Sequence, residues 1–202
     1  MKIINAFKKI NKAIISSLNE IVSKRRNAAG YRLRNSINGW IRSSPEIESL
    51  LSDGFPNSLS AQFGLRQGSA EQAVEDIVNA IVSSIQIDFK KIDKNFTGGI
   101  EFKCQPTTFS AILGLSSGHV FTEKGTDLHW IDWLLTQGDK VIVVGYRYQA
   151  ASAGRSGGGR MIPRGVFRVP PKFSGSINDN FITRALSGKE QEISNILRGV
   201  FK

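Results

Sequence analysis

The chain has 202 residues, of which 40% are hydrophobic and 22% charged, a composition typical of globular proteins and unlike that of disordered or fibrous ones. A single cysteine, Cys104, excludes an internal disulfide and agrees with a reducing compartment. No apolar run approaches the roughly 18 residues of a membrane span, and lysines interrupt the apolar N-terminal residues where a signal peptide needs an unbroken stretch. We therefore expect a soluble intracellular product with no membrane partner.

The net charge of +10 is unevenly distributed along the chain. Residues 1–42 hold ten basic residues and one acid, whereas residues 43–139 hold six basic and thirteen acidic residues. Residues 140–178 hold seven basic residues and no acid. Opposite charges on different parts of one chain favour head-to-tail contact between copies, and the basic parts are equally suited to nucleic acid.

Apolar residues recur every three or four positions near the N-terminus, at Ile3, Phe7, Ile10, Ile14, Leu18 and Ile21. This spacing predicts an amphipathic helix over residues 2 to about 26, and a second helical stretch follows over about 29–42. We interpret residues 1–43 as a basic helical arm. The stripe formed by Phe7, Ile10 and Ile14 suits a neighbouring subunit, an anionic membrane or nucleic acid, and its helical spacing favours the neighbouring subunit.

Residues 44–202 are predicted to form a single α+β domain. Ser44 with the following proline and glutamate is typical of a helix start, and Ser69 begins a longer amphipathic helix. The hydrophobic period then changes to two, and the runs on either side of residues 95–99 predict a β-hairpin.

Four further elements are predicted in the second half of the chain. They are a short helix over residues 126–135, a buried strand over Lys140–Tyr148, a long loop over Ala151–Gly165 and a C-terminal helix over residues 179–198 that Gly188 is placed to divide. The loop has five glycines, three arginines and no acid, so we expect it to meet a partner rather than help build a core. The predicted fold is therefore α+β, with a helical arm followed by a small antiparallel sheet flanked by helices.

Two features suggest chemistry, and both have a simpler interpretation. The run GRSGGGR at Gly154–Arg160 resembles a phosphate-binding loop, but the Lys-Ser/Thr pair of that motif is missing, which favours a flexible basic loop. His129 and Asp132 are one helical turn apart, as in an acid–base or metal site, yet no Cys/His cluster supplies a further ligand. We expect no enzymatic activity, and predict no catalytic, cofactor-binding or metal-binding residue.

Trp130 and Trp133 lie three residues apart on the predicted short helix. Tryptophan is enriched at subunit interfaces, and it is also a common core residue. Both interpretations stay open from the sequence.

The order and residue pattern of several segments resemble those of the neck or tail-completion proteins of tailed bacteriophages. The segments are His119–Tyr148, Gly154–Met161 and Phe167–Leu186, with an upstream hairpin at Asn95–Leu113. The resemblance implies a non-enzymatic α+β protein that assembles in the virion as a ring, a hexamer or dodecamer, at the head–tail junction, in a tail-completion or tail-terminator role.

The same resemblance implies contacts with other neck and tail proteins, namely a portal-side adaptor and the tail tube or sheath, and non-specific contact with packaged DNA. The basic residues expected at intersubunit or DNA-facing contacts are Arg155, Arg160, Arg164 and Arg168. The alternative function is that of a sequence-independent nucleic-acid-binding protein, which the acidic middle of the chain disfavours.

Overall fold

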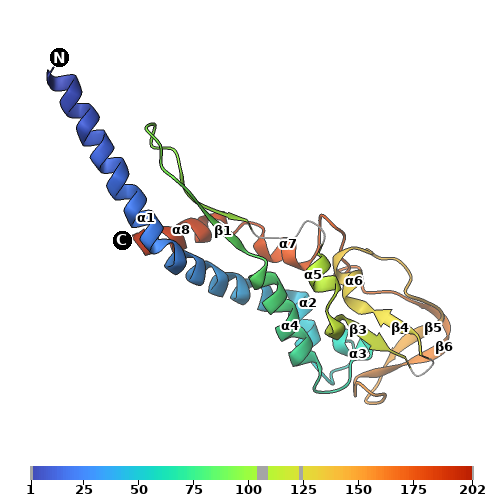
Figure 1. Cartoon of the computed structure of the whole chain (residues 1–202). Coiled ribbons are helices and arrows are strands. Elements are labelled where there is room, and N and C mark those ends of the chain that lie inside the picture. The colour runs from blue at the N-terminus through green and yellow to red at the C-terminus, as the bar shows by residue number, and fades with distance from the viewer. Residues whose placement is uncertain (1, 104–108, 123–124, 202) are drawn as a thin grey trace. The chain divides into compact units, whose positions relative to one another are not determined.

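The computed structural model of the chain describes residues 2–103, 109–122 and 125–201, so Cys104 lies outside the described residues (Figure 1). Its long helices and two-stranded antiparallel sheets confirm the α+β class. The chain divides into two compact units. Unit 1 holds the described residues within 1–36, 84–105 and 188–202, and unit 2 holds those within 37–83 and 106–187.

Helix α1 (Lys2–Arg42) is one continuous helix, so the predicted interruption between residues 26 and 29 is wrong. Those residues contain no proline, and the glycine that follows them, Gly30, is explained by close packing rather than by a break in the helix. A Cβ on Gly30 would lie 2.6 Å from Cδ1 of Ile87, so a glycine allows the strand to approach the helix closely. Strand β1 (Gln86–Lys90) pairs with β2 (Gly99–Lys103) in register from Gln86↔Lys103 to Lys90↔Gly99, which confirms the predicted hairpin.

Polar side chains of α1 hold this hairpin and the C-terminal helix α8 (Glu190–Phe201) within unit 1. Arg26 Nη2 donates to the carbonyl of Ile87 at 2.7 Å, and Asn19 exchanges two hydrogen bonds with the backbone of Ile92. The other bonds of this kind run from Arg34 to Ile85, from Arg32 to Gly199 and from Arg25 to Val200, each to a carbonyl oxygen. Several arginines of the basic arm are therefore used inside the unit.

Unit 2 is built from short elements around a buried centre. In chain order they are α2 (Pro45–Leu51), α3 (Leu59–Phe63), α4 (Ala70–Ser83), α5 (Ser110–Leu113), η1 (Ser116–Gly118), β3 (His119–Phe121), β4 (Asp127–His129), α6 (Trp130–Leu135), β5 (Val143–Ala150), β6 (Gly159–Phe167) and α7 (Phe181–Leu186). The Trp130 indole is fully buried, its Nε1 donates to the carbonyl of Ser117 at 3.0 Å, and its ring packs on Phe63 with centroids 5.3 Å apart. These contacts place Trp130 in the core.

The prediction that the strand over Lys140–Tyr148 is buried is wrong. The strand begins at Val143 as β5, and most of its side chains are exposed, with Val144 at 77%. Among the described residues β5 pairs with β6 alone, and at 77% exposure Val144 has no described element packed over it. An apolar run records hydrophobicity, whereas burial depends on what packs over it.

The predicted loop over Ala151–Gly165 is also shorter than expected. Residues 159–165 belong to β6, and only residues 151–158 connect the two strands. This connection packs against its own unit, because Ser156 is buried and a Cβ on Gly158 would lie 2.6 Å from both Cβ of Ala61 and the carbonyl oxygen of Phe55. The expectation that this segment contributes nothing to a core is wrong for these residues.

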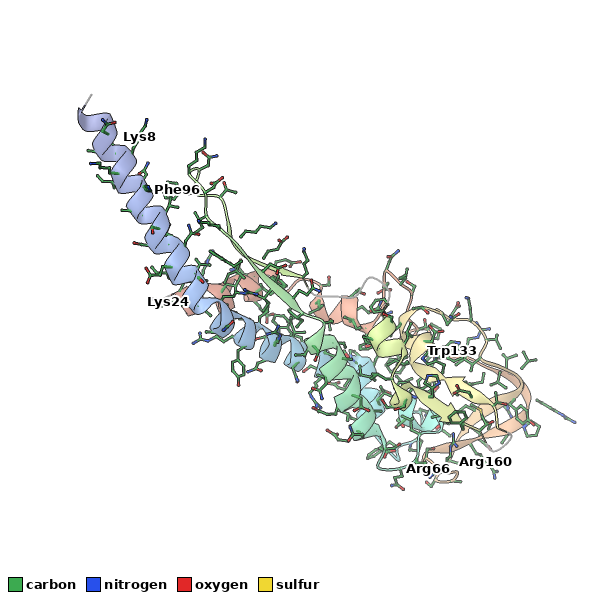
Figure 2. All side chains as sticks on the ribbon, viewed as in Figure 1. Lys8, Lys24, Arg66, Phe96, Trp133 and Arg160 are labelled. Atoms are coloured by element: carbon green, nitrogen blue, oxygen red, sulfur yellow. The ribbon has the colours of Figure 1, made fainter. Side chains whose placement is uncertain are left out.

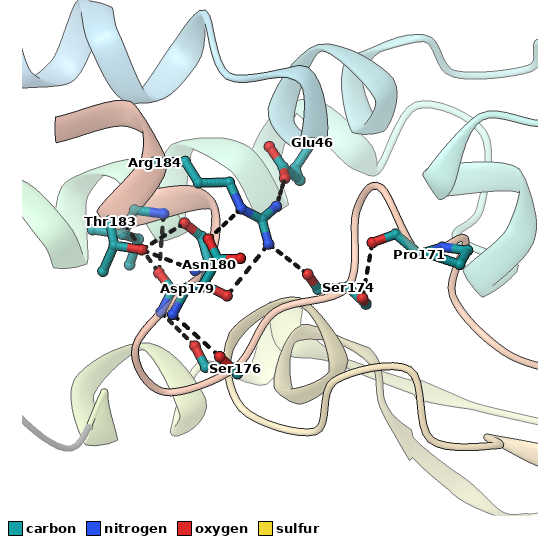
Figure 3. Close-up of polar contacts among 9 residues, drawn as sticks. Glu46, Pro171, Ser174, Ser176, Asp179, Asn180, Thr183 and Arg184 are labelled. Carbon is teal, nitrogen blue, oxygen red and sulfur yellow. Dashed lines mark hydrogen bonds and ion pairs between the residues drawn. The ribbon is translucent and has the colours of Figure 1, made fainter. Parts of the chain in front are cut away.

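The predicted C-terminal helix is two helices, α7 and α8, and they belong to different units. Gly188 separates them with φ of +73°, the left-handed conformation that ends a helix and that glycine adopts at least cost. At its start α7 has a capping box: Asn180 Oδ1 accepts from the amides of Ile182 and Thr183, and Thr183 Oγ1 accepts from the amide of Asn180 at 2.9 Å (Figure 3).

Replacing Asn180 with alanine is expected to destabilise unit 2 by about 2 kcal/mol, the upper end for a lost cap. The high value follows from complete burial of the side chain, whose Nδ2 also donates to the carbonyl of Ser176. Urea unfolding followed by tryptophan fluorescence measures the change. Asn178→Ala is the matched control, since that side chain is exposed and its loss should stay within about 0.5 kcal/mol. Equal losses in both variants would contradict the capping role.

Candidate functional site

The β5–β6 hairpin of unit 2, residues 143–167, is called the ribbon here. Directly paired residues project to the same side, and sides alternate along each strand. The pairs Arg147↔Ile162 and Gln149↔Arg160 therefore share one side, the arginine face. The opposite side, the apolar face, carries the pairs Val144↔Val166, Tyr146↔Pro163 and Tyr148↔Met161.

Both faces of the ribbon are open over much of their length. On the arginine face Arg147 and Arg160 are exposed, and Figure 2 marks Arg160 on its strand. On the apolar face Val144 and Val166 are 77% and 49% exposed. The turn end is tied to the rest of unit 2, because the amide of Asn57 donates to the hydroxyl of Tyr148 at 3.2 Å. At the other end Phe167 is buried, so the ribbon is held at both ends and its exposed side chains lie between them.

A bulge interrupts the ribbon between Val144 and Tyr146. Opposite it Arg164 has φ of +72°, followed by Gly165 at +120°. A non-glycine residue in the left-handed region costs roughly 1–2 kcal/mol, so an arginine there is an unfavourable choice for the fold alone. Bulges re-aim side chains, and the Arg164 side chain is exposed.

The four predicted arginines divide into two pairs. Arg155 Nη1 donates to the carbonyl of Phe121 at 2.9 Å, and Arg168 Nη1 lies 3.9 Å from the carboxylate of Asp139. For Arg160 and Arg164 the structure records no ion pair or hydrogen bond of the side chain to any described residue. The first pair is occupied within its own unit, and the second is open to a partner.

Arg147 was missed by the sequence reasoning, although it shares the arginine face with Arg160. The signal that would have found it is the alternation of Tyr146, Arg147 and Tyr148, which places the arginine opposite to its tyrosine neighbours. Its position across from Arg160 depends on the register and could not be read from one strand.

The second candidate surface is the arm stripe, defined as Phe7, Ile10, Ile14 and Ile21 of α1 in unit 1. These side chains are between 43% and 63% exposed. Lys8, Lys9 and Lys12 are also exposed, and the 100° rotation per residue of an α-helix places them on another side. Lys8 is marked near the start of the helix in Figure 2. The predicted amphipathic helix is present, and its apolar stripe faces solvent.

The two tryptophans occupy different environments. The core alternative holds for Trp130, since its side chain is fully buried and has no surface to offer a neighbour. Trp133 is partly exposed on α6 (Figure 2), and its carbonyl accepts a hydrogen bond from the amide of Gly175 at 3.0 Å. Trp133 is thus the one of the two that can reach a partner.

The acid–base arrangement of His129 and Asp132, which the sequence disfavours, has no hydrogen bond between the two side chains among the contacts recorded for the described residues. Asp132 instead accepts hydrogen bonds from Thr136 and Gln137, the latter at 2.7 Å. The ring of His129 stacks on His119 with centroids 4.1 Å apart, and His119 Nδ1 lies 2.9 Å from the Asp127 carboxylate. These contacts join β3 to β4. Within the described ranges no group of three or more His, Cys, Asp or Glu side chains is placed to hold a metal ion.

The helices among the described residues include none with an apolar stretch long enough to cross a bilayer. A scan against protein-family models and searches of curated proteins and of solved structures found no match for this chain. The proposal for its function therefore rests on the surfaces that the chain presents and on the resemblance of residues 95–186 described above.

Proposed function

We propose that this chain is a non-enzymatic structural subunit of the neck of a tailed phage, where copies assemble into a ring in a tail-completion or tail-terminator role. The observation that supports assembly is the exposed arm stripe. The position in the neck comes from the resemblance carried by residues 95–186.

The arm stripe is costly for a chain that stays alone. Its four large apolar side chains face water on one line of α1. Burying a side chain of this size against a partner contributes about 1.5–3 kcal/mol, and soluble monomers rarely expose large contiguous apolar patches. A neighbouring copy that covers the stripe removes this cost.

The apolar face of the ribbon is a second uncovered surface, with Val144 and Val166 exposed as a cross-strand pair. Two different uncovered surfaces on one subunit suit two different neighbours. A heterologous contact of this kind closes into a ring when its rotation permits. This matches the assembly implied by the resemblance.

The variant Phe7→Gln/Ile10→Gln/Ile14→Gln is expected to fold but to lose assembly. Glutamine keeps the helix, while the stripe loses its apolar surface. Light scattering on the purified chain measures its mass in solution, and electron microscopy of phage that carries the variant gene reports completed particles. The matched control is Lys8→Gln/Lys9→Gln/Lys12→Gln, which changes the same helix on its other side and should assemble. Normal particles from the first variant would rule out this role of the stripe.

The neck position is tested by immunogold electron microscopy of purified phage particles with antibody against this chain. Label at the head–tail junction supports the proposal. Label elsewhere on the tail keeps the structural role and moves its place. Particles that contain none of this chain would overturn the proposal.

A further inference from the structure

We propose that the arginine face of the ribbon, formed by Arg147 and Arg160 with the bulge residue Arg164, binds the phosphate backbone of double-stranded DNA without reading its sequence. That this DNA is the packaged genome rests on the proposed function. The binding surface itself does not depend on ring formation.

The charge of this segment is of one sign. Residues 140–178 contain seven basic residues and no acid, so the arginine face meets no opposing carboxylate along its own strands. B-DNA carries one negative charge per about 1.7 Å of its axis, and its major groove, about 12 Å wide, admits a two-stranded ribbon. Guanidinium groups bind phosphate oxygens through two parallel hydrogen bonds. Duplex DNA therefore offers both the charge and the width that this face requires.

A second copy of the chain is a weaker partner for these arginines. Most of its described acidic side chains are already engaged by groups of their own chain. Ion pairs of this kind join Glu46 to Arg184, Glu71 and Glu75 to Arg42, Glu101 to Lys90 and Asp139 to Arg168. A new partner for these carboxylates would compete with the cations that they already contact, whereas the phosphates of DNA exchange only mobile counterions.

The bulge gives an independent reason to assign function to this face. Arg164 is held at φ of +72°, where glycine would carry no steric penalty. Strained residues of this type are concentrated at functional sites, and the bulge turns the exposed arginine out of the regular ladder. The apolar face lies on the other side of the ribbon, so a protein neighbour there leaves the arginines accessible.

The test is fluorescence anisotropy of the full chain with a labelled random-sequence duplex, over a series of salt concentrations. For Arg147→Gln/Arg160→Gln/Arg164→Gln we expect the slope of log affinity against log salt to fall by about 2.7, since each neutralised phosphate contributes about 0.9. The arm variant Lys8→Gln/Lys9→Gln/Lys12→Gln removes the same net charge and should leave most of the slope. Arg155→Gln, at an arginine tied to the carbonyl of Phe121, should leave it unchanged.

Arg164→Gly separates binding from folding. It removes one charge and relieves the backbone strain, so we expect a higher melting temperature together with a slope lower by about 0.9. Parallel loss of stability and binding would show that the arginine acts only through the fold, and would overturn its assignment.

Four results would overturn the inference. They are wild-type protein that does not bind the duplex, binding that is insensitive to salt, a slope lost in the arm variant rather than the ribbon variant, and poly-glutamate that binds the ribbon as well as DNA does. Loss of DNA binding with normal ring assembly in the triple ribbon variant supports the inference. DNA binding by a chain that is absent from phage particles would contradict the proposed role in the neck, but it would leave the inference that the arginine face binds DNA intact.

Discussion

Replacing Arg184 with alanine is expected to lower the free energy of unfolding of unit 2 by about 3 kcal/mol, the lower end of the usual cost of removing one partner of a buried ion pair, because the Arg184 side chain is itself 34% exposed. Arg184 Nη1 donates to Oε1 of Glu46 at 2.6 Å, and Nη2 donates to the carbonyl of Ser174 at the same distance (Figure 3). The Glu46 side chain is only 2% exposed. Without the guanidinium its charge would remain buried with no counter-charge.

The local environment keeps the guanidinium charged. Partial burial lowers the pKa of Arg184, but the hydrogen bond to Asp179 and the negative charges of Glu46 and Asp179 outweigh it, so the pKa is raised above its ordinary value. The ion pair is therefore not lost by deprotonation of its arginine at high pH within the range where proteins fold.

All three tryptophans, Trp40, Trp130 and Trp133, lie in unit 2, so tryptophan fluorescence during urea unfolding reports on this unit. Asp179→Ala removes the other, exposed carboxylate partner of Arg184 and should cost less than about 1 kcal/mol. The double variant Glu46→Leu/Arg184→Met should recover most of the loss, because it removes the buried carboxylate together with its partner. A loss below about 1 kcal/mol for Arg184→Ala would show that Glu46 is reached by water.

Replacing Gly175 with alanine is expected to cost about 3 kcal/mol or more, because the new methyl group would overlap the main chain of α6. A Cβ at this position would meet the carbonyl of Leu134 and would lie 3.0 Å from Cβ of Asn180. The helix cannot move aside, since the amide of Gly175 donates to the carbonyl of Trp133 and its carbonyl accepts from the amide of Gly138 at 2.7 Å.

Gly138→Ala is the matched control for this prediction. Gly138 has φ of +66°, and nothing lies within 4 Å of a Cβ built there, so alanine should cost only the conformational penalty of about 1 kcal/mol. Thermal unfolding followed by fluorescence compares the two variants, and Trp133 lies beside the site. If Gly175→Ala is no more harmful than the control, the close approach of the two segments is not maintained in solution.

Local patterns in the sequence were enough to predict the elements whose signals are short in range. The amphipathic period of α1, the start of α4 after Ser69 and the change to period two at β1 each depend on residues within a few positions of one another. These local preferences persist in the fold, so the α+β class followed from them.

The tertiary structure alone decided which of these residues are covered. Arg155 and Arg160 are equivalent in the sequence, yet only Arg155 has the carbonyl of Phe121 within reach. The same holds for Val144, which lies in an apolar run but outside any core. Periodicity determines which side chains share a face, whereas the partner of that face comes from residues distant in the chain or from another molecule. For this protein the sequence determined the faces, and long-range packing decided which of them stayed open.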